Sequence, residues 1–187
     1  GGLLLMQRST SIGATKWGDA AALTQMYVDG APPTAATSGL GVNPSAFTVA
    51  RGPLFAYVGE TATKAPELWI KTPGAAARAV TTLNQQWASI PVVAPEFVKY
   101  KSFDGVEIEA ALLLPAGVAS GLSQTRSGSS RTLPLVVLVH GGPTGRWSDS
   151  FEPWGQLLAA RGYAVLYPNV RGSTGYGQRF VEMNRAD

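Results

Sequence analysis

Residues 135–143 have the sequence LVVLVHGGP, in which an unbroken apolar run leads directly into a histidine and two glycines. An apolar run of this length, bounded by glycine and proline, predicts a strand buried on both faces, as in a parallel sheet. Glycines at the end of such a strand leave backbone N–H groups uncovered at the carboxyl edge of the sheet, where they can bind a negatively charged oxygen. The stretch therefore predicts an α/β fold with an oxyanion-binding loop at residues 140–143.

The sequence that follows predicts one β-α-β crossover. Residues 154–161 have the pattern of a helix that ends at Gly162, and residues 163–167 form a second apolar run. A glycine-rich loop, NVRGSTGYG at residues 169–177, comes directly after that run. In a parallel sheet this loop and the one after residue 139 lie at the same edge.

Residues 178–184 predict the start of another helix, shortly before the last residue, Asp187. Two parallel strands cannot cover both faces of a sheet. We therefore expect sequence beyond Asp187, or another chain, to complete it.

The chain lacks the nucleophile that such a loop serves. No five consecutive residues fit Gly-x-Ser-x-Gly, the pattern of a serine at a strand-to-helix turn. The only histidine, His140, precedes every position where that serine could lie, whereas in this fold the base follows the serine. A complete Ser-His-Asp triad is therefore excluded for these 187 residues.

The N-terminal half predicts a different architecture. Short apolar runs broken by Gly, Pro, Ser and Thr indicate antiparallel β structure, either propeller blades or a sandwich. Weak similarity between residues 25–30 and 67–74, about one blade apart, favours a propeller. The runs occupy residues 3–6, 23–28, 46–49, 54–58 and 67–70.

The pattern changes at residues 91–95, PVVAP, whose two prolines suit an extended connector. We predict a domain boundary there, with propeller-like antiparallel structure over residues 1–95 and an α/β domain over residues 96–187. Strands at residues 97–101 and 106–112 flank Asp104-Gly105, which predicts a hairpin. Residues 117–132 are rich in Gly and Ser and predict a surface loop.

Composition excludes several classes of function. The net charge of +3 is spread along the chain, which gives no support to nucleic-acid binding. The absence of cysteine excludes disulfides and thiolate sites, and it leaves the compartment undetermined, with the cytoplasm slightly favoured. The apolar start, residues 1–8, is too short for a signal-peptide core or a membrane span. No His/Asp/Glu cluster has metal-ligand spacing, so no metal or cofactor is expected.

Four stretches together resemble the prolyl oligopeptidase family of serine peptidases, and in particular its acylaminoacyl-peptidase and dipeptidyl-peptidase-like branch. The similarity is clear over residues 45–187 and weak over residues 1–44, and APELWI at residues 65–70 looks like the family's last propeller strands. The four stretches are DGxxIxA at 104–110, HGGP at 140–143, LAARGYAV at 158–165 and PNVRGSTGYG at 168–177.

The resemblance implies that residues 1–95 are the C-terminal part of a β-propeller and residues 96–187 the N-terminal part of an α/β-hydrolase domain, both incomplete. It implies hydrolysis of short peptides, such as aminoacyl, acylaminoacyl or dipeptidyl substrates, through an acyl-enzyme. It places the family's serine, aspartate and histidine beyond Asp187, so the isolated chain is expected to be inactive. Peptide substrate is the expected partner, together with the missing C-terminal part of the hydrolase domain or further copies in a homo-oligomer. Neither nucleic acid nor membrane is an expected partner.

The resemblance also implies roles for the loop at the end of the first strand. Gly142 is the expected backbone oxyanion donor, while Gly141 serves either the turn or the oxyanion. His140 is expected to orient the loop through a side-chain hydrogen bond, with at most a minor electrostatic role toward the oxyanion, and not to act as a base.

Three further residues are candidates for contact with substrate. Arg171 lies on the glycine-rich loop and could bind a substrate carboxyl group, although a salt bridge that fixes the loop is the alternative. Tyr176 and Trp147 could line the substrate region, although aromatic residues beside glycine turns commonly just pack.

Two other functions remain open from the sequence. A carboxylesterase or lipase shares the His-Gly-Gly motif and the α/β-hydrolase core. A non-catalytic subunit would pair with a separate chain that supplies the triad.

Overall fold

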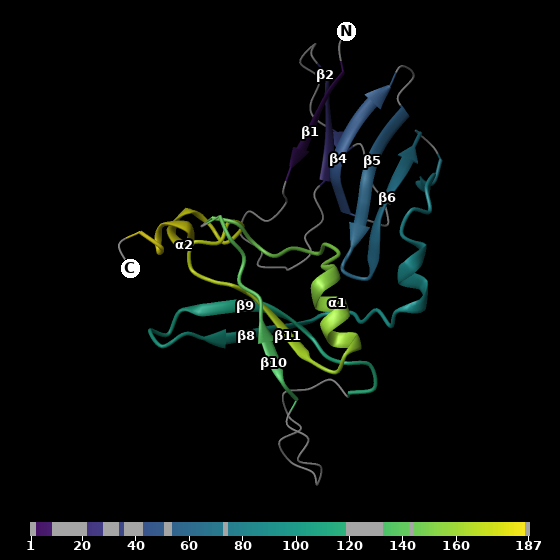
Figure 1. The fold of residues 1–187 in the computed structure, drawn as a ribbon. Coiled ribbons are helices and arrows are strands. Elements are labelled where there is room, and N and C mark those ends of the chain that lie inside the picture. The colour runs from purple at the N-terminus through teal and green to yellow at the C-terminus, as the bar shows by residue number, and fades with distance from the viewer. Residues whose placement is uncertain are drawn as a thin grey trace. The chain divides into compact units, whose positions relative to one another are not determined.

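The computed structural model describes residues 3–8, 22–27, 34–35, 43–50, 54–72, 75–118, 133–142 and 144–185 (Figure 1). The chain divides into two compact units, which are Gly1–Gln85 with Ser148–Phe151, and Gln86–Trp147 with Glu152–Asp187. Most of the predicted loop 117–132 and Pro143 of the predicted oxyanion loop lie outside the described residues.

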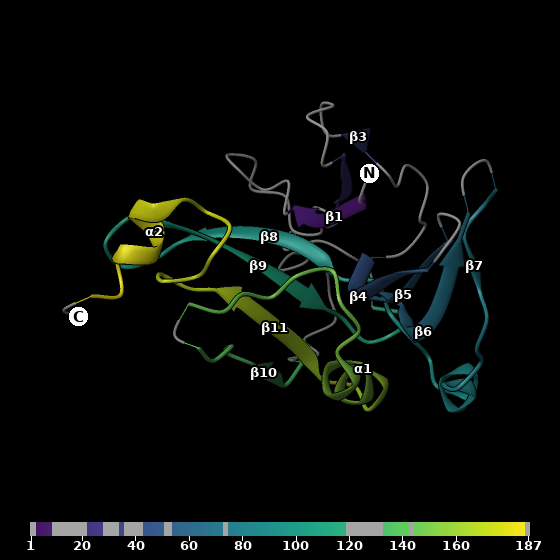
Figure 2. The same ribbon diagram turned by 90° about the horizontal axis from the view of Figure 1, so that it is seen from above.

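The first unit consists of two antiparallel sheets, as the short apolar runs predict. One sheet has the order β1-β2-β3 and the other β4-β5-β6-β7, so that strands adjacent in sequence are adjacent in the sheet (Figures 1 and 2). The strands are β1 (Leu3–Arg8), β2 (Ala22–Tyr27), β3 (Thr34–Ala35), β4 (Asn43–Ala50), β5 (Leu54–Thr61), β6 (Lys64–Lys71) and β7 (Arg78–Ala79).

Tyr57 of β5 is the buried centre of the second sheet, and its ring stacks on Trp69 of β6 with 6.5 Å between centroids. The Glu67 carboxylate accepts hydrogen bonds from the Thr81 hydroxyl and from the N–H of Leu83, the latter at 3.0 Å. These bonds, that of Thr81 first, lower the pKa of Glu67. The residues after β7 are thereby fixed against β6.

The second unit contains a mixed sheet with the order β10-β11-β9-β8 (Figure 2). The predicted hairpin is present, because β8 (Glu96–Lys101) and β9 (Glu107–Leu113) pair antiparallel around a turn in which Gly105 has φ of 82°. β11 (Ala164–Asn169) runs antiparallel to β9 and parallel to β10 (Leu135–Val137). A 3-10 helix (Gln85–Ser89) comes before this sheet in sequence.

The predicted β-α-β crossover is also present, with α1 (Pro153–Ala160) between β10 and β11. Gly162 ends this helix at φ 90°, and its N–H donates to Ala159 O at 3.0 Å while Tyr163 N–H donates to Leu158 O at 3.1 Å. α1 packs mainly against β11 and β9. The helix predicted after the glycine-rich loop is α2 (Gln178–Glu182). No helix of the described residues is long and apolar enough to span a membrane.

The prediction that residues 135–139 form a fully buried strand is wrong. The strand covers only Leu135–Val137, and the side chains of Leu135, Val137 and Val139 are 54%, 49% and 61% exposed. Within the described residues β11 is the only strand paired with β10, and α1 packs mainly on the other strands. Apolar residues at this edge therefore remain uncovered.

The shortness of β10 has a cause in β11. Ala164 N–H donates to Pro134 O, and Leu138 N–H donates to Leu166 O, both at 2.9 Å. Residues 164 and 166 of β11 therefore direct their backbone groups toward β10, and in a strand the next to do so is Pro168. Proline has no N–H to donate to Leu138 O, so the ladder ends at this point.

Candidate functional site

The candidate site is formed by two loops of the second unit that follow neighbouring parallel strands. Residues 138–147 follow β10 and residues 170–177 follow β11, so both loops start at the carboxyl edge of the same sheet. Thr174 N–H donates to Gly145 O at 3.2 Å, which joins the two loops directly. The site residues predicted from sequence all lie on these loops.

The two glycines of the first loop differ in whether a side chain would fit at their position. Gly142 has φ of 129°, and a Cβ at this position would lie 2.7 Å from Gly145 N, so a side chain is excluded. A Cβ on Gly141 would meet nothing within 4 Å. Gly142 is exposed, and no described residue accepts a hydrogen bond from its N–H. Its N–H is therefore not engaged by the described residues, and the roles of both glycines in binding an oxyanion stay predictions.

His140 links the two loops. Its Nε2 lies 2.7 Å from Ser173 Oγ, and its Nδ1 lies 3.1 Å from Gly141 O. Ser173 is fully buried, and its hydroxyl proton goes to Val170 O at 2.6 Å, so its oxygen accepts from the Nε2–H of His140. In the neutral Nε2–H tautomer the hydrogen bond to Ser173 joins the two loops, while Nδ1 has no proton to donate to Gly141 O. That arrangement is compatible with an orienting role, which remains a prediction.

Trp147 closes the first loop on itself. Its indole Nε1–H donates to Leu138 O at 3.0 Å, which is the carbonyl that Pro168 leaves without a ladder partner. Its ring packs edge-on against Tyr167, with 4.7 Å between centroids, and more loosely against His140, at 6.4 Å. The indole is thus engaged within the protein rather than directed only at a substrate.

Asn169 is the residue of this site to which sequence reasoning gave no role. It is 1% exposed, and its Oδ1 accepts from Trp147 N–H at 2.7 Å. Its Nδ2 donates to Trp147 O at 3.2 Å and to the Tyr176 hydroxyl at 2.8 Å. The available signal was a polar residue at the end of an apolar strand, where a buried amide needs partners.

Tyr176 uses its hydroxyl inside the protein. The hydroxyl donates to Glu109 Oε1 at 3.1 Å, and the ring packs on Phe180 with 5.0 Å between centroids. Burial, together with the nearby Glu109 charge, raises the pKa of Tyr176 well above its ordinary value. The phenol therefore stays protonated and acts as a donor to the carboxylate.

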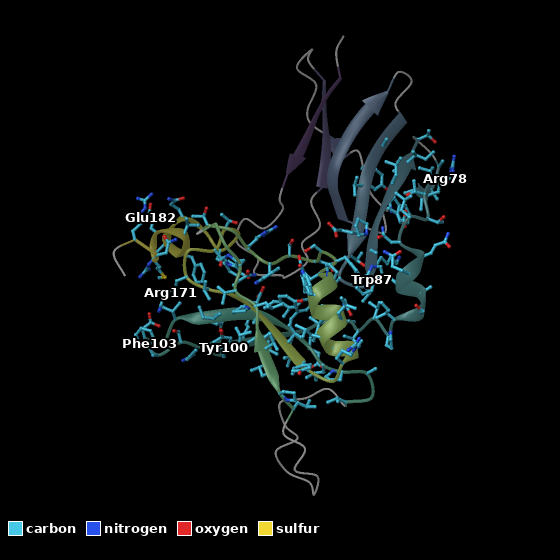
Figure 3. All side chains as sticks on the ribbon, viewed as in Figure 1. Arg78, Trp87, Tyr100, Phe103, Arg171 and Glu182 are labelled. Carbon is cyan, nitrogen blue, oxygen red and sulfur yellow. The ribbon has the colours of Figure 1, made fainter. Side chains whose placement is uncertain are left out.

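Arg171 lies apart from this network, at the turn of the β8–β9 hairpin (Figure 3). Its guanidinium pairs with Asp104 and lies over the Phe103 ring at 5.1 Å from the centroid. Partial burial raises the pKa of Asp104, but the Val106 N–H and the Arg171 charge together lower it below its ordinary value. The salt bridge that was the alternative for Arg171 is present, and a role in substrate binding stays a prediction.

The structure therefore connects His140, Trp147 and Tyr176, the last two through Asn169, and places Arg171 elsewhere. Among the described residues, no group of three or more His, Cys, Asp or Glu could hold a metal ion. The chemistry that the site offers is hydrogen-bond donation from a backbone amide held in a glycine turn.

Comparison with known proteins gives a consistent result. Residues 149–187 match the model of the prolyl oligopeptidase family. The chain is 40% identical over 93 residues to the uncharacterized peptidase YuxL of Bacillus subtilis (strain 168), covering 50% of this chain and 13% of that protein. It is 38% identical over 97 residues to dipeptidyl aminopeptidase BIII of Pseudoxanthomonas mexicana, covering 52% and 14%. The resemblance inferred from the four sequence stretches is thereby confirmed.

Solved structures agree with these matches. The uncomplexed acylaminoacyl peptidase of Pyrococcus horikoshii superposes with a TM-score of 0.66 at 26% identity, covering 90% of this chain and 24% of that one. The structure of a puromycin hydrolase complex superposes with a TM-score of 0.64 at 24% identity, and the match covers 97% of this chain and 26% of the hydrolase chain. At this identity the match supports only the fold. The chain thus spans about a quarter of these structures, and 13% and 14% of the two curated relatives.

Proposed function

Because residues 149–187 belong to the prolyl oligopeptidase family, we propose that this chain supplies the oxyanion-binding loop of a serine-type peptidase that hydrolyses short peptides. The observation that carries the proposal is the exposed residue Gly142, whose N–H has no acceptor among the described residues, in a glycine turn at the carboxyl edge of the mixed sheet. One named relative is a dipeptidyl aminopeptidase and one structural neighbour is an acylaminoacyl peptidase, and those are the substrate classes proposed here.

In the proposed reaction a serine hydroxyl attacks the peptide carbonyl carbon while a histidine takes its proton. The carbonyl electron pair moves to the oxygen, and the Gly142 N–H donates to the resulting oxyanion. The C–N bond then breaks, the histidine gives its proton to the leaving amine, and water hydrolyses the acyl-enzyme. The serine, aspartate and histidine of this scheme come from sequence outside these 187 residues, since the chain has no Gly-x-Ser-x-Gly.

The two units receive their roles within this proposal. The antiparallel sheet β4–β7 is a blade at the C-terminal end of a propeller that extends to residue 95, beyond the end of the first compact unit at Gln85, and residues 96–187 begin the α/β-hydrolase domain. In support, the first unit has only antiparallel pairing among its described strands, and the second contains a β-α-β crossover. The propeller would restrict access to peptides of small size.

The test is a parallel assay of the complete gene product and of the 187-residue chain. We expect the complete product to react with a fluorophosphonate probe and to cleave fluorogenic dipeptidyl or acylaminoacyl substrates, and the 187-residue chain to do neither. Labelling of a serine within residues 1–187 would contradict the proposed origin of the nucleophile. Hydrolysis of short-chain esters without any peptide cleavage would favour a carboxylesterase instead.

A further inference from the structure

The buried side chain of Asn169 hydrogen-bonds to both backbone groups of Trp147, its N–H and its C=O. Its Oδ1 accepts from Trp147 N–H at 2.7 Å and its Nδ2 donates to Trp147 O at 3.2 Å. A side-chain amide bound in this way replaces a strand partner and fixes the backbone at that residue. At 1% exposure, water does not compete for these bonds.

The orientation of the amide is determined by the groups around it. The Tyr176 hydroxyl has one proton, and that proton goes to Glu109 Oε1 at 3.1 Å. The hydroxyl oxygen can therefore only accept from Asn169, which places Nδ2 on this side and Oδ1 toward Trp147 N–H. Glu109 is itself the β9 partner of Asn169 in the strand register, so the chain of hydrogen bonds returns to the sheet.

Fixing Trp147 also fixes the loop that carries the oxyanion donor. The Trp147 indole closes the loop by donating to Leu138 O at 3.0 Å, so both ends of residues 138–147 are joined to each other and to β11. Gly142 lies between these ends, in a turn whose backbone admits no side chain. Displacement of Trp147 would therefore move the Gly142 N–H.

We propose that Asn169 is a positioning residue, which holds loop 138–147 so that the Gly142 N–H points at the oxyanion of the tetrahedral intermediate. The proposal rests on the proposed function of the loop. Asn169 does not touch the substrate; it acts through Trp147. Its contribution is consequently made in the transition state, where the carbonyl oxygen gains charge, rather than in binding the substrate.

The chain contains a matched control. Gln156 of α1 is also 1% exposed, and its amide also pairs with both backbone groups of one residue, accepting from Val93 N–H and donating to Val93 O, each at 2.9 Å. Val93 lies in the segment before β8, away from the two loops in sequence and pairing. Substitution of Gln156 removes the corresponding two hydrogen bonds, to Val93 rather than to Trp147, from the same degree of burial.

The experiment compares Asn169→Leu with Gln156→Met in the complete enzyme, using a fluorogenic peptide substrate. Asn169→Leu is expected to lower kcat by about 10- to 100-fold, less than the loss of a whole oxyanion donor, with KM nearly unchanged. The Ki of a peptide boronate, which mimics the tetrahedral intermediate, should rise by the same factor. Gln156→Met should leave kcat and that Ki as in the unmodified enzyme.

Hydrogen exchange of the peptide covering residues 138–147 gives a readout that does not depend on catalysis. It should be faster in Asn169→Leu and unchanged in Gln156→Met. If Asn169→Leu does not fold, Tyr176→Phe is the alternative, because it removes the hydroxyl that accepts from Asn169 Nδ2. It should change kcat, the boronate Ki and hydrogen exchange in the same directions by smaller factors. Equal losses of kcat in both amide variants, or a raised KM with unchanged kcat, would overturn the positioning role. An unmodified enzyme without fluorophosphonate labelling would overturn the proposed function instead.

Discussion

β10 and β11 are neighbouring parallel strands that look alike in sequence and differ in their surroundings. Five of the six residues of β11 are buried, whereas none of the three residues of β10 is. β11 is paired with β10 and β9 and covered by α1, while β10 is paired with β11 alone among the described strands. Apolar composition therefore predicts that a strand forms, and the neighbouring elements determine how much of that strand is buried.

The two strands also differ in their effect on the loop that follows β10. β11 ends in Pro168 and Asn169, and both act on the loop after β10, the first by freeing Leu138 O and the second by binding Trp147. The buried strand thus determines the conformation of the loop that follows the exposed one. Four experiments test the differences between the two strands and their loops.

The largest effect is expected where α1 packs on β11. A Cβ on Gly155 would overlap the Tyr167 hydroxyl and lie 2.6 Å from its Cζ. Gly155→Ala should therefore lower the free energy of unfolding by about 3 kcal/mol, at the upper end of overpacking effects. Urea denaturation measures this loss, and Tyr167→Phe in the same chain should restore part of it. A double variant no more stable than Gly155→Ala would show that the hydroxyl is not the obstacle.

A direct comparison of the two strands comes next. Val165 of β11 is 0% exposed and Val137 of β10 is 49% exposed. Val165→Ala should cost about 2 kcal/mol of unfolding free energy, and Val137→Ala less than about 1 kcal/mol, because only the first leaves a cavity. Denaturant midpoints of the two variants give the comparison. Equal losses would mean that β10 is as well covered in solution as β11.

The two glycines of the oxyanion loop provide a third pair. Gly142→Ala places a side chain at φ 129° and 2.7 Å from Gly145 N, whereas Gly141→Ala meets nothing within 4 Å. The first should cost about 1–3 kcal/mol through strain, and the second much less. In the complete enzyme only Gly142→Ala should strongly lower kcat. A greater loss of kcat in Gly141→Ala would transfer the donor role to Gly141.

Much of this arrangement follows from local sequence signals. Asp104-Gly105 predicts the hairpin, Gly162 predicts the end of α1, and the apolar runs predict β10 and β11, because each depends on residues close in sequence. The positive φ of Gly142 is likewise consistent with its place in a turn.

The remainder depends on residues distant in sequence. Glu109 and Tyr176 are 67 positions apart, and Trp147 and Asn169 are 22 apart, so their pairing becomes visible only when β9, β11 and the two loops are assembled. The exposure of β10 also depends on its neighbours rather than on its own residues. Pro168 and the polar Asn169 after it are local signals of the loop structure, since a proline within a strand pattern predicts an interrupted ladder and a buried amide needs partners.

The smallest effect is expected from substitution of Pro168. Pro168→Ala restores an N–H that can donate to Leu138 O, in competition with the Trp147 indole. The unfolding free energy should fall by about 1 kcal/mol or less, partly through the freer unfolded chain, and Pro153→Ala at the start of α1 is the control for that contribution. The specific readout is exchange of the Trp147 indole proton by NMR, expected to be faster in Pro168→Ala and unchanged in Pro153→Ala. Unchanged exchange in both would mean that the indole keeps Leu138 O even against a strand partner, so that the loop is held by Asn169 and the packing of Trp147 rather than by the interruption of β10.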